Sequence, residues 1–179
     1  MLKIIIFLSV FLNSFSLFSL EVTLTQGSIK PTPIAVTNLF ANNSNFEKLG
    51  KNISNVISDN LERSGLFIPL DQKAFIQTNK SLSDQPRFED WRIIKAQHLV
   101  SGNISGSNGK ISVEFRLYDV FQQKQLVGRK YETNEKNWRR VAHIISDSVF
   151  KNITGEGGYF DTRIVYVAET GPKDNKQKR

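Results

Sequence analysis

The stretch that decides the fold is residues 138–169, WRRVAHIISDSVFKNITGEGGYFDTRIVYVAE. Its apolar residues recur at the spacing of one helical face, and polar residues fill the remaining positions. We expect Asn134 to be the N-cap and Gly155 to take the left-handed conformation that ends many helices. The pattern predicts an amphipathic helix over about Glu135–Thr154, whose apolar stripe is Trp138, Val141, Ala142, Ile145, Val149 and Ile153.

A second module is expected to begin after this helix. Gly155, Gly157 and Gly158 predict a short flexible joint. Residues 163–168, RIVYVA, are typical of a buried strand. The residues that follow are Gly171-Pro172 and a basic run to Arg179, which offer this strand no partner. The expected second module is therefore cut off shortly after its start.

Four blocks of the sequence, taken in order, resemble the TolB family of the bacterial Tol-Pal envelope system. They are SLEVTL at 19–24, PTPIAV at 31–36, SGLF-PL at 64–70, and WRR-A-H-I-D with ITG-GYFDTRIVYV-E inside 138–169. The resemblance implies an α/β domain followed by a six-bladed β-propeller, of which only the first strand would be present here. It also implies a periplasmic adaptor without catalytic activity.

The resemblance implies two protein partners. In this family the propeller binds the peptidoglycan-associated lipoprotein Pal, and the mature N-terminus engages the inner-membrane protein TolA. The system supports outer-membrane integrity and constriction during cell division. Binding to Pal would need the missing propeller, so the expected partner of this chain is TolA.

The first 19 residues are typical of a secretory signal peptide. They contain one positive charge at Lys3, an apolar core from Ile4 to Leu12, and small residues near the end. The apolar run is shorter than the roughly 20 residues of a membrane-spanning helix, so we expect no membrane insertion. Cleavage is expected between Ser19 and Leu20, with cleavage after Leu20 as the alternative. The sequence thus predicts export to the periplasm.

Composition and charge bound the remaining possibilities. The chain has no cysteine, so an ordinary hydrophobic core must hold the exported protein without disulfides. Of the net charge of +7, Lys3 carries one and residues 173–179 a net three, which leaves +3 over residues 20–172. Because nucleic-acid binding usually needs Lys and Arg clustered on one face, we expect no nucleic-acid partner.

The segment at the mature N-terminus is the candidate partner-binding site. LEVTLTQ alternates with period two and is rich in β-forming residues, so it predicts a strand. Val22 and Leu24 would face one side, and Glu21, Thr23 and Thr25 would face the other. We expect the segment to bind TolA by adding a strand to the partner's sheet. The alternative is an edge strand of its own domain. The site residues are Leu20, Glu21, Val22, Thr23, Leu24, Thr25 and Gln26.

Two further helices and a short turn are predicted. The spacing of Ser44 and Glu47 predicts a capping box at the start of a helix over Asn45–Ser64, which Gly65 ends. Pro86 is expected at the first position of a short helix that reaches Lys95. A weakly patterned region indicates a turn of helix near Lys73–Gln77.

The predicted strands include a clear hairpin. Asn108-Gly109 is the strongest short hairpin signal, and it lies between two alternating runs. In the second run an apolar set alternates with Ser112, Glu114, Arg116 and Tyr118, which predicts one face on a core. Pro69 is expected at a strand end or edge. The strands are Ile34–Thr37, Leu66–Leu70, His98–Ser105, Ile111–Leu117 and Leu126–Thr133.

The order of elements predicts an α/β fold. Helices separated by strands can cover both faces of a sheet, which favours three layers over an antiparallel sheet with one wet face. We predict a three-layer domain over residues 20–158, with a mixed sheet of about five strands and helices packed on it. Residues 1–19 precede it as the signal peptide. Residues 159–179 follow as the first strand of an incomplete β-propeller.

No catalytic constellation is visible. The glycine-rich run Gly102–Lys110 has Ile104 where a phosphate loop needs glycine, so it predicts a hairpin. His143 and Asp147 are spaced as helical neighbours, but without a third ligand they indicate a surface pair and not a metal site. Trp91 and Trp138 are expected in the core. We predict no enzymatic activity, no cofactor and no metal; the alternative function is a small periplasmic ligand-binding or enzymatic domain.

Overall fold

The computed structural model describes residues 30–41, 43–77, 85–163, 167, 169–170 and 177–178. The predicted signal peptide, its cleavage site and the candidate binding strand at 20–26 lie outside the described residues. So do most residues of the strand predicted at 163–168, although Arg163 and Val167 are described and are exposed.

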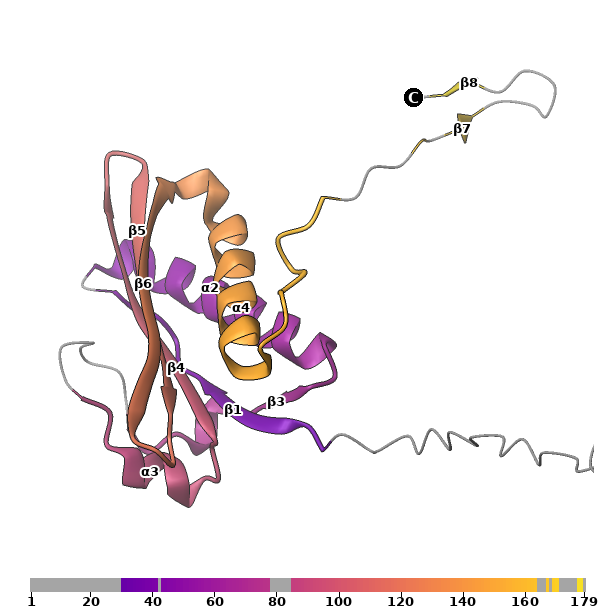
Figure 1. The fold of residues 1–179 in the computed structure, drawn as a ribbon. Coiled ribbons are helices and arrows are strands. Elements are labelled where there is room, and N and C mark those ends of the chain that lie inside the picture. Colours follow the sequence, from indigo (N-terminus) through magenta and orange to yellow (C-terminus); the bar gives the residue numbers. More distant parts are fainter. Residues whose placement is uncertain are drawn as a thin grey trace, which may run out of the picture.

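The domain is built on one mixed sheet of six strands in the order β3-β1-β4-β5-β6, with β2 also paired to β4 (Figure 1). The strands β1, β2 and β3 run parallel to their neighbours, whereas β4, β5 and β6 form antiparallel ladders. This confirms the predicted mixed sheet. The bounds are β1 Thr32–Val36, β2 Phe40–Ala41, β3 Phe67–Pro69, β4 His98–Ser107, β5 Lys110–Asp119 and β6 Lys124–Asn134.

In the described part of the chain three α-helices accompany the sheet: α2 Ser44–Arg63, α3 Phe88–Ile93 and α4 Trp138–Thr154. Two 3₁₀ turns, η1 Gln72–Ala74 and η2 Glu135–Asn137, precede α3 and α4. The residue after α4, Gly155, has φ of 80°, which confirms the predicted left-handed end. The last predicted helix thus exists, but its first turn is the 3₁₀ turn η2.

The helix starts differ from prediction in detail. The side chain of Asn43 caps α2 by accepting the N–H of Asn45 at 3.0 Å, so the predicted capping box at Ser44 is wrong. Arg87 is the N-cap of α3, which puts Pro86 before the helix and not at its first position. Asn134 precedes η2, but its side chain makes no capping hydrogen bond. Adjacent Asn and Ser are almost equally good caps, so pattern alone does not choose between them.

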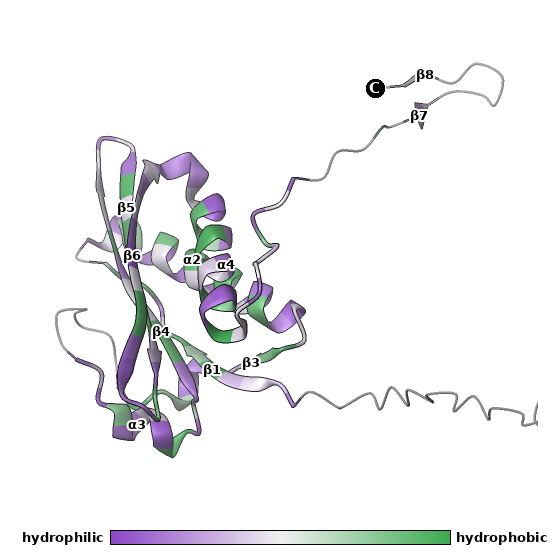
Figure 2. Ribbon diagram, viewed as in Figure 1, coloured by the Kyte–Doolittle hydropathy of each residue, from purple (hydrophilic) through white to green (hydrophobic). Residues whose placement is uncertain are grey.

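The three layers are unequal because both long helices pack on one face of the sheet. Apolar residues of α2 and α4 share a single core with the inward positions of β5, Ile111, Val113, Phe115 and Leu117. In Figure 2, hydrophobic and hydrophilic residues alternate around both helices. This confirms the predicted apolar stripes. Within the described ranges, the opposite face is covered by the short α3 together with Leu70 and Phe75, which pack against the second core.

The second core lies under α3 at one end of the sheet. Trp91 is 1% exposed and packs with Ala35 and Leu99, whose chain neighbours face the other core. Tyr118 joins it through an edge-on contact with Phe88, at 5.9 Å between ring centroids. Beyond α3 this face carries the alternating polar positions of β5, such as Glu114 and Arg116, which form an ion pair of 3.1 Å. The expectation that helices would cover both faces is therefore met only in part.

The remaining sequence expectations can be placed on this frame. Asn108 and Gly109 have φ of 51° and 73°, which confirms the hairpin turn between β4 and β5. Trp91 is core as predicted, whereas Trp138 is half-buried, with the guanidinium carbon of Arg139 4.3 Å from its ring centroid. A short antiparallel pair, β7 Glu169–Thr170 with β8 Gln177–Lys178, was not predicted. This pair lies beyond residues 163–168, so the expectation that the strand predicted there lacks a partner stays a prediction.

Candidate partner-binding site

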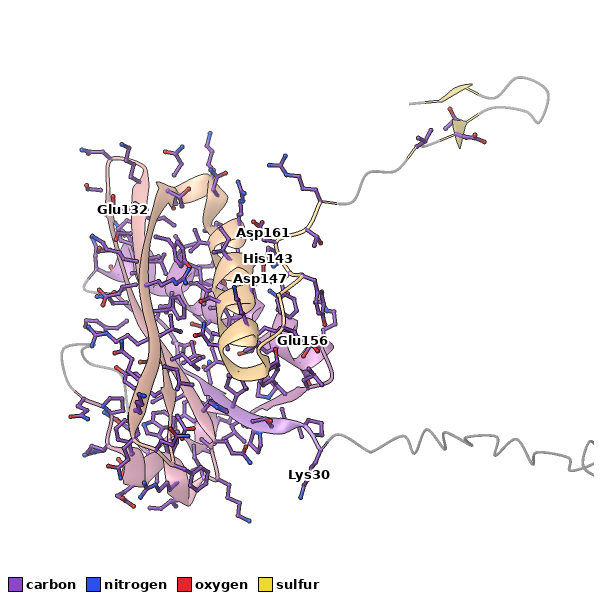
Figure 3. All side chains as sticks on the ribbon, viewed as in Figure 1. Lys30, Glu132, His143, Asp147, Glu156 and Asp161 are labelled. Atoms are coloured by element: carbon purple, nitrogen blue, oxygen red, sulfur yellow. The ribbon has the colours of Figure 1, made fainter. Side chains whose placement is uncertain are left out.

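The N-terminal junction of the domain is the part of the structure nearest in sequence to the candidate binding strand. Lys30, labelled in Figure 3, is exposed and leads into β1. The sheet ladder begins at Thr32, whose N–H donates to the carbonyl of Leu66 at 2.8 Å. Pro31 precedes β1 and has no N–H to donate, whereas Pro33 also lacks an N–H and yet lies within the strand, where its carbonyl accepts the N–H of Gln97 at 3.0 Å. Residues 20–26 precede the described start of the sheet in sequence.

The chain enters the sheet through an interior strand. Thr32 is in register with Phe67 of β3 on one side, and Ile34 is in register with His98 of β4 on the other. The two registers overlap at Ile34, so β3 lies beside the first three residues of β1 and β4 lies beside its last three. β1 is therefore an interior strand of the sheet.

The two strands at the ends of the main path, β3 and β6, offer little for pairing with another chain. β3 has three residues and ends in Pro69, at the position predicted for this proline. β6 is long, but charged side chains line it, and Lys130 and Glu132 form an ion pair of 3.0 Å. Charge on an edge strand opposes pairing with a further strand.

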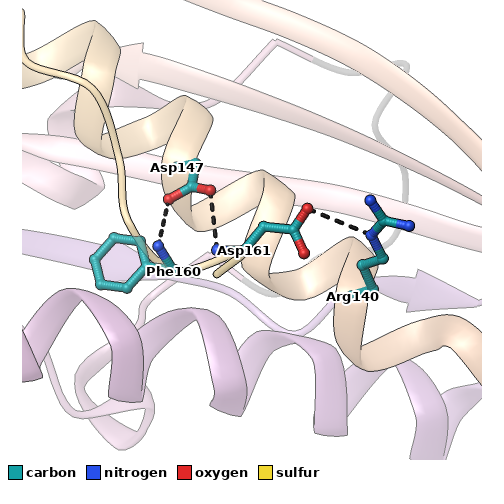
Figure 4. A network of polar contacts seen from close by, with 4 residues as sticks. All are labelled: Arg140, Asp147, Phe160 and Asp161. Carbon is teal, nitrogen blue, oxygen red and sulfur yellow. Dashed lines mark hydrogen bonds and ion pairs between the residues drawn. The ribbon is translucent and has the colours of Figure 1, made fainter. Parts of the chain in front are cut away.

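The C-terminal junction holds polar contacts that the sequence did not predict. Asp147 on α4 accepts the N–H of Phe160 at 2.7 Å and the N–H of Asp161 at 3.1 Å (Figure 4). Arg140 donates to the carboxylate of Asp161 at 3.3 Å. The chain after α4 therefore lies back against that helix.

The predicted surface pair of His143 and Asp147 is wrong. Nδ1 of His143 lies 2.9 Å from the side-chain nitrogen of Asn60 on α2, and Asp147 is engaged by the main chain at Phe160 and Asp161. Two neighbours on a helix can each have a partner on another segment, and here tertiary contacts determine the partners of His143 and Asp147. Among the described residues, no group of three or more His, Cys, Asp or Glu is arranged to hold a metal ion.

Two open grooves flank the helices. One, of about 540 Å³, lies between β2 and the start of α2; the other, of about 560 Å³, lies between β6 and α4. Burial lowers the pKa of His98 below its ordinary value, but this histidine is on β4 and lines neither groove. Neither groove is therefore lined by a titratable group with a shifted pKa, and such a group in a cleft is what marks many active sites.

An open mixed sheet with two helices on one face, entered through an interior strand, defines the chain as an α/β domain of the open-sheet class. A family model described as the TolB amino-terminal domain matches residues 20–126. The chain therefore belongs to the TolB family and to the Tol-Pal system.

Individual relatives agree with this assignment. The chain is 47% identical over 160 residues to the Tol-Pal system protein TolB of Paramagnetospirillum magneticum, covering 89% of this chain and 36% of that protein. It is 46% identical over 184 residues to TolB of Pelagibacter ubique, covering 98% and 41%. The crystal structure of TolB from Acinetobacter baumannii superposes with a TM-score of 0.63 at 25% identity, covering 77% of this chain and 32% of that one. The chain thus spans about two fifths of the length of these curated relatives or less.

These relatives are envelope proteins. None of the helices in the described ranges is long and apolar enough to cross a membrane.

Proposed function

We propose that this chain acts in the periplasm as an adaptor of the Tol-Pal system, and that Leu20–Gln26 binds TolA by strand addition. In this role the protein links TolA to Pal and supports outer-membrane integrity and constriction at division. We also propose that the chain has three parts: a signal peptide at 1–19, an α/β domain at 20–158, and the start of a β-propeller at 159–179. The link to Pal requires a propeller after residue 158. No catalytic activity is proposed.

The observation that carries the proposal is that the match to the TolB amino-terminal domain begins at residue 20, so the segment 20–26 belongs to the family's domain. The described sheet begins only at Thr32, and β1 lies between β3 and β4. The proposal assigns the main-chain donors and acceptors of residues 20–26 to a partner's strand.

The outer strands of the sheet are less suited than residues 20–26 to pair with a strand of a partner. The two outer strands are a three-residue strand ending in proline and a charged strand. Both are poor acceptors for an added strand. The alternating run at 20–26 has its apolar residues on one side and is therefore better suited to define a register.

The proposal is tested by deleting residues 20–26 from the mature protein and titrating it with the C-terminal domain of TolA. We expect the loss of measurable binding and a folded domain, because the core lies within residues 34–153. The matched control replaces Lys130 and Glu132 on β6 by glutamine, which alters the charged edge and leaves 20–26 intact. Undiminished binding by a folded deletion variant would place the epitope elsewhere. Loss of binding in the β6 variant alone would assign it to that edge.

A further inference from the structure

We propose that α4 and the connector, residues 158–161, form a fixed joint in which Asp147 clamps the main chain and so sets the direction in which the chain leaves the domain. The presence of a module after this joint depends on the proposed domain division. The proposal for the joint itself depends only on contacts between described residues. It replaces the flexible joint that the glycines at 155, 157 and 158 predict.

The clamp uses both carboxylate oxygens of one side chain. Oδ1 of Asp147 accepts from Phe160 and Oδ2 accepts from Asp161, at 2.7 and 3.1 Å. Hydrogen bonds to an ionised acceptor are among the strong ones. Two consecutive N–H groups held by one carboxylate fix both the position and the orientation of the connector backbone.

A second contact lies two turns away on the same helix. Arg140 is seven residues before Asp147, so the two side chains lie on one face, roughly 10 Å apart along the helix axis. Arg140 bonds the Asp161 side chain at 3.3 Å, and Asp147 bonds the Asp161 main chain. The connector is thus anchored at two points along α4, and it runs back toward the start of that helix (Figure 4).

Aromatic packing supports the polar contacts. The ring centroid of Phe150 on α4 is 5.6 Å from Tyr159 and 5.8 Å from Phe160, both edge-on. Phe160 packs against the main core, whereas Tyr159 is 52% exposed. The connector therefore contributes apolar burial at Phe160 and leaves the preceding residue, Tyr159, half exposed to solvent.

Two of the three glycines are required by this geometry. Gly155 has positive φ, at which the chain turns back after α4. A Cβ at Gly158 would overlap the carboxylate of Asp147 and would come within 2.7 Å of its Cβ. Gly157 has nothing within 4 Å of such an atom. Gly158 thus admits the connector to Asp147, whereas Gly157 serves as an internal control.

Amide hydrogen exchange of the 179-residue chain, followed by NMR, tests the clamp. We expect slow exchange at Phe160 and Asp161. Asp147→Ala should speed it about tenfold or more at both, and Asp147→Asn, with one acceptor oxygen, at one of them. Gly158→Ala should act like Asp147→Ala, whereas Gly157→Ala and Asp59→Ala, an exposed carboxylate on α2, should change neither amide. Amides of β4–β6 report whether each variant is folded.

The direction of the chain is tested with a spin label. The chain has no cysteine, so Thr162→Cys gives a single labelling site just beyond the clamp. We expect the label to broaden amides near Arg140, and Asp147→Ala to weaken that broadening at least twofold. Fast exchange at both amides in the unaltered chain, or broadening that Asp147→Ala leaves unchanged, would overturn the joint. Neither measurement uses TolA or Pal, so its failure is distinct from failure of the adaptor proposal.

Discussion

The side-chain nitrogen of Asn60 on α2 lies 2.9 Å from Nδ1 of His143 on α4. Asn60 is 3% exposed and also donates to the hydroxyl of Ser146 at 3.0 Å, and Ser146 in turn donates to the carbonyl of Ala142. The two long helices therefore meet through a satisfied polar network at the edge of an apolar core. Such a network fixes how the helices align, because only one alignment pairs all its members.

We predict that Asn60→Ala lowers the free energy of unfolding by about 1–3 kcal/mol, since it leaves a cavity and removes two hydrogen bonds between the helices. Asn55→Ala, at an exposed position of the same helix, is the control for helix propensity. Urea denaturation of the two variants gives the comparison. Equal stabilities would mean that the network contributes nothing beyond propensity.

The stability of the domain should depend on pH through His98. Burial is the larger influence on its pKa and lowers it below the ordinary 6.5, while the charge of Asp119, opposite on β5, acts in the other direction. The unfolded chain therefore binds a proton more readily than the folded one. The stability that neutral His98 contributes is complete above a pH of about 6.5 and is lost as the pH falls through its lowered pKa.

The corresponding measurement is the free energy of unfolding of the unaltered chain and of His98→Gln between about pH 7.5 and about pH 5. The unaltered chain should lose more stability over this range than the variant. Parallel curves for the two proteins would exclude His98 as a source of the pH dependence.

The elements with local signals were predictable from sequence. The turn at Asn108-Gly109 needs positive φ at both central residues, which few dipeptides other than this one supply. The alternation from Ile111 to Leu117 predicts which face of the strand is buried, because successive side chains point to opposite faces. The apolar stripes of α2 and α4 carry the same kind of information at the helical period.

What the sequence missed depends on contacts between distant residues. β2 has two residues, and it exists because Phe40 pairs with Asn103, far along the chain. The sequence pattern pairs Asp147 with His143 because it reveals only how the two residues are spaced on the helix. Its actual partners become available only after the chain reverses at Gly155. The role of Leu20–Gln26 in binding stays a prediction, since those residues lie outside the described ranges.

Gly102 on β4 should be irreplaceable. An added Cβ would overlap the carbonyl of Glu114 on β5 and a methyl group of Leu39, and would lie 3.3 Å from Cα of Phe115. Because a neighbouring strand's backbone cannot move without breaking its ladder, we expect Gly102→Ala to cost about 2 kcal/mol or more. Gly157→Ala, which meets open space, should leave the thermal midpoint nearly unchanged. Similar midpoints for both variants would show that the sheet yields at this position.

Two neighbouring residues at the start of α2 should differ in how much their replacement affects stability. Asn43→Ala should destabilise the domain by about 1 kcal/mol, because it removes the acceptor for the N–H of Asn45. Ser44→Ala should change stability by only a few tenths of a kcal/mol, since the helix has already begun at that residue. Chemical denaturation of the two single variants distinguishes them. The reverse order would restore the capping box that the sequence pattern indicates.

The last prediction concerns which side of the segment 20–26 faces TolA. In strand addition the main chain supplies affinity, and alternate side chains enter the partner's surface and set the register. Val22 and Leu24 are two of the apolar residues on one side. Replacing both by aspartate should weaken binding to the C-terminal domain of TolA by at least about tenfold, since burying either side chain contributes about 1.5–3 kcal/mol. Replacing Thr23 and Thr25 by aspartate adds the same charge on the other side and should weaken it far less. Calorimetric titration of both double variants gives the comparison, and equal losses of affinity would contradict binding through one face of a strand.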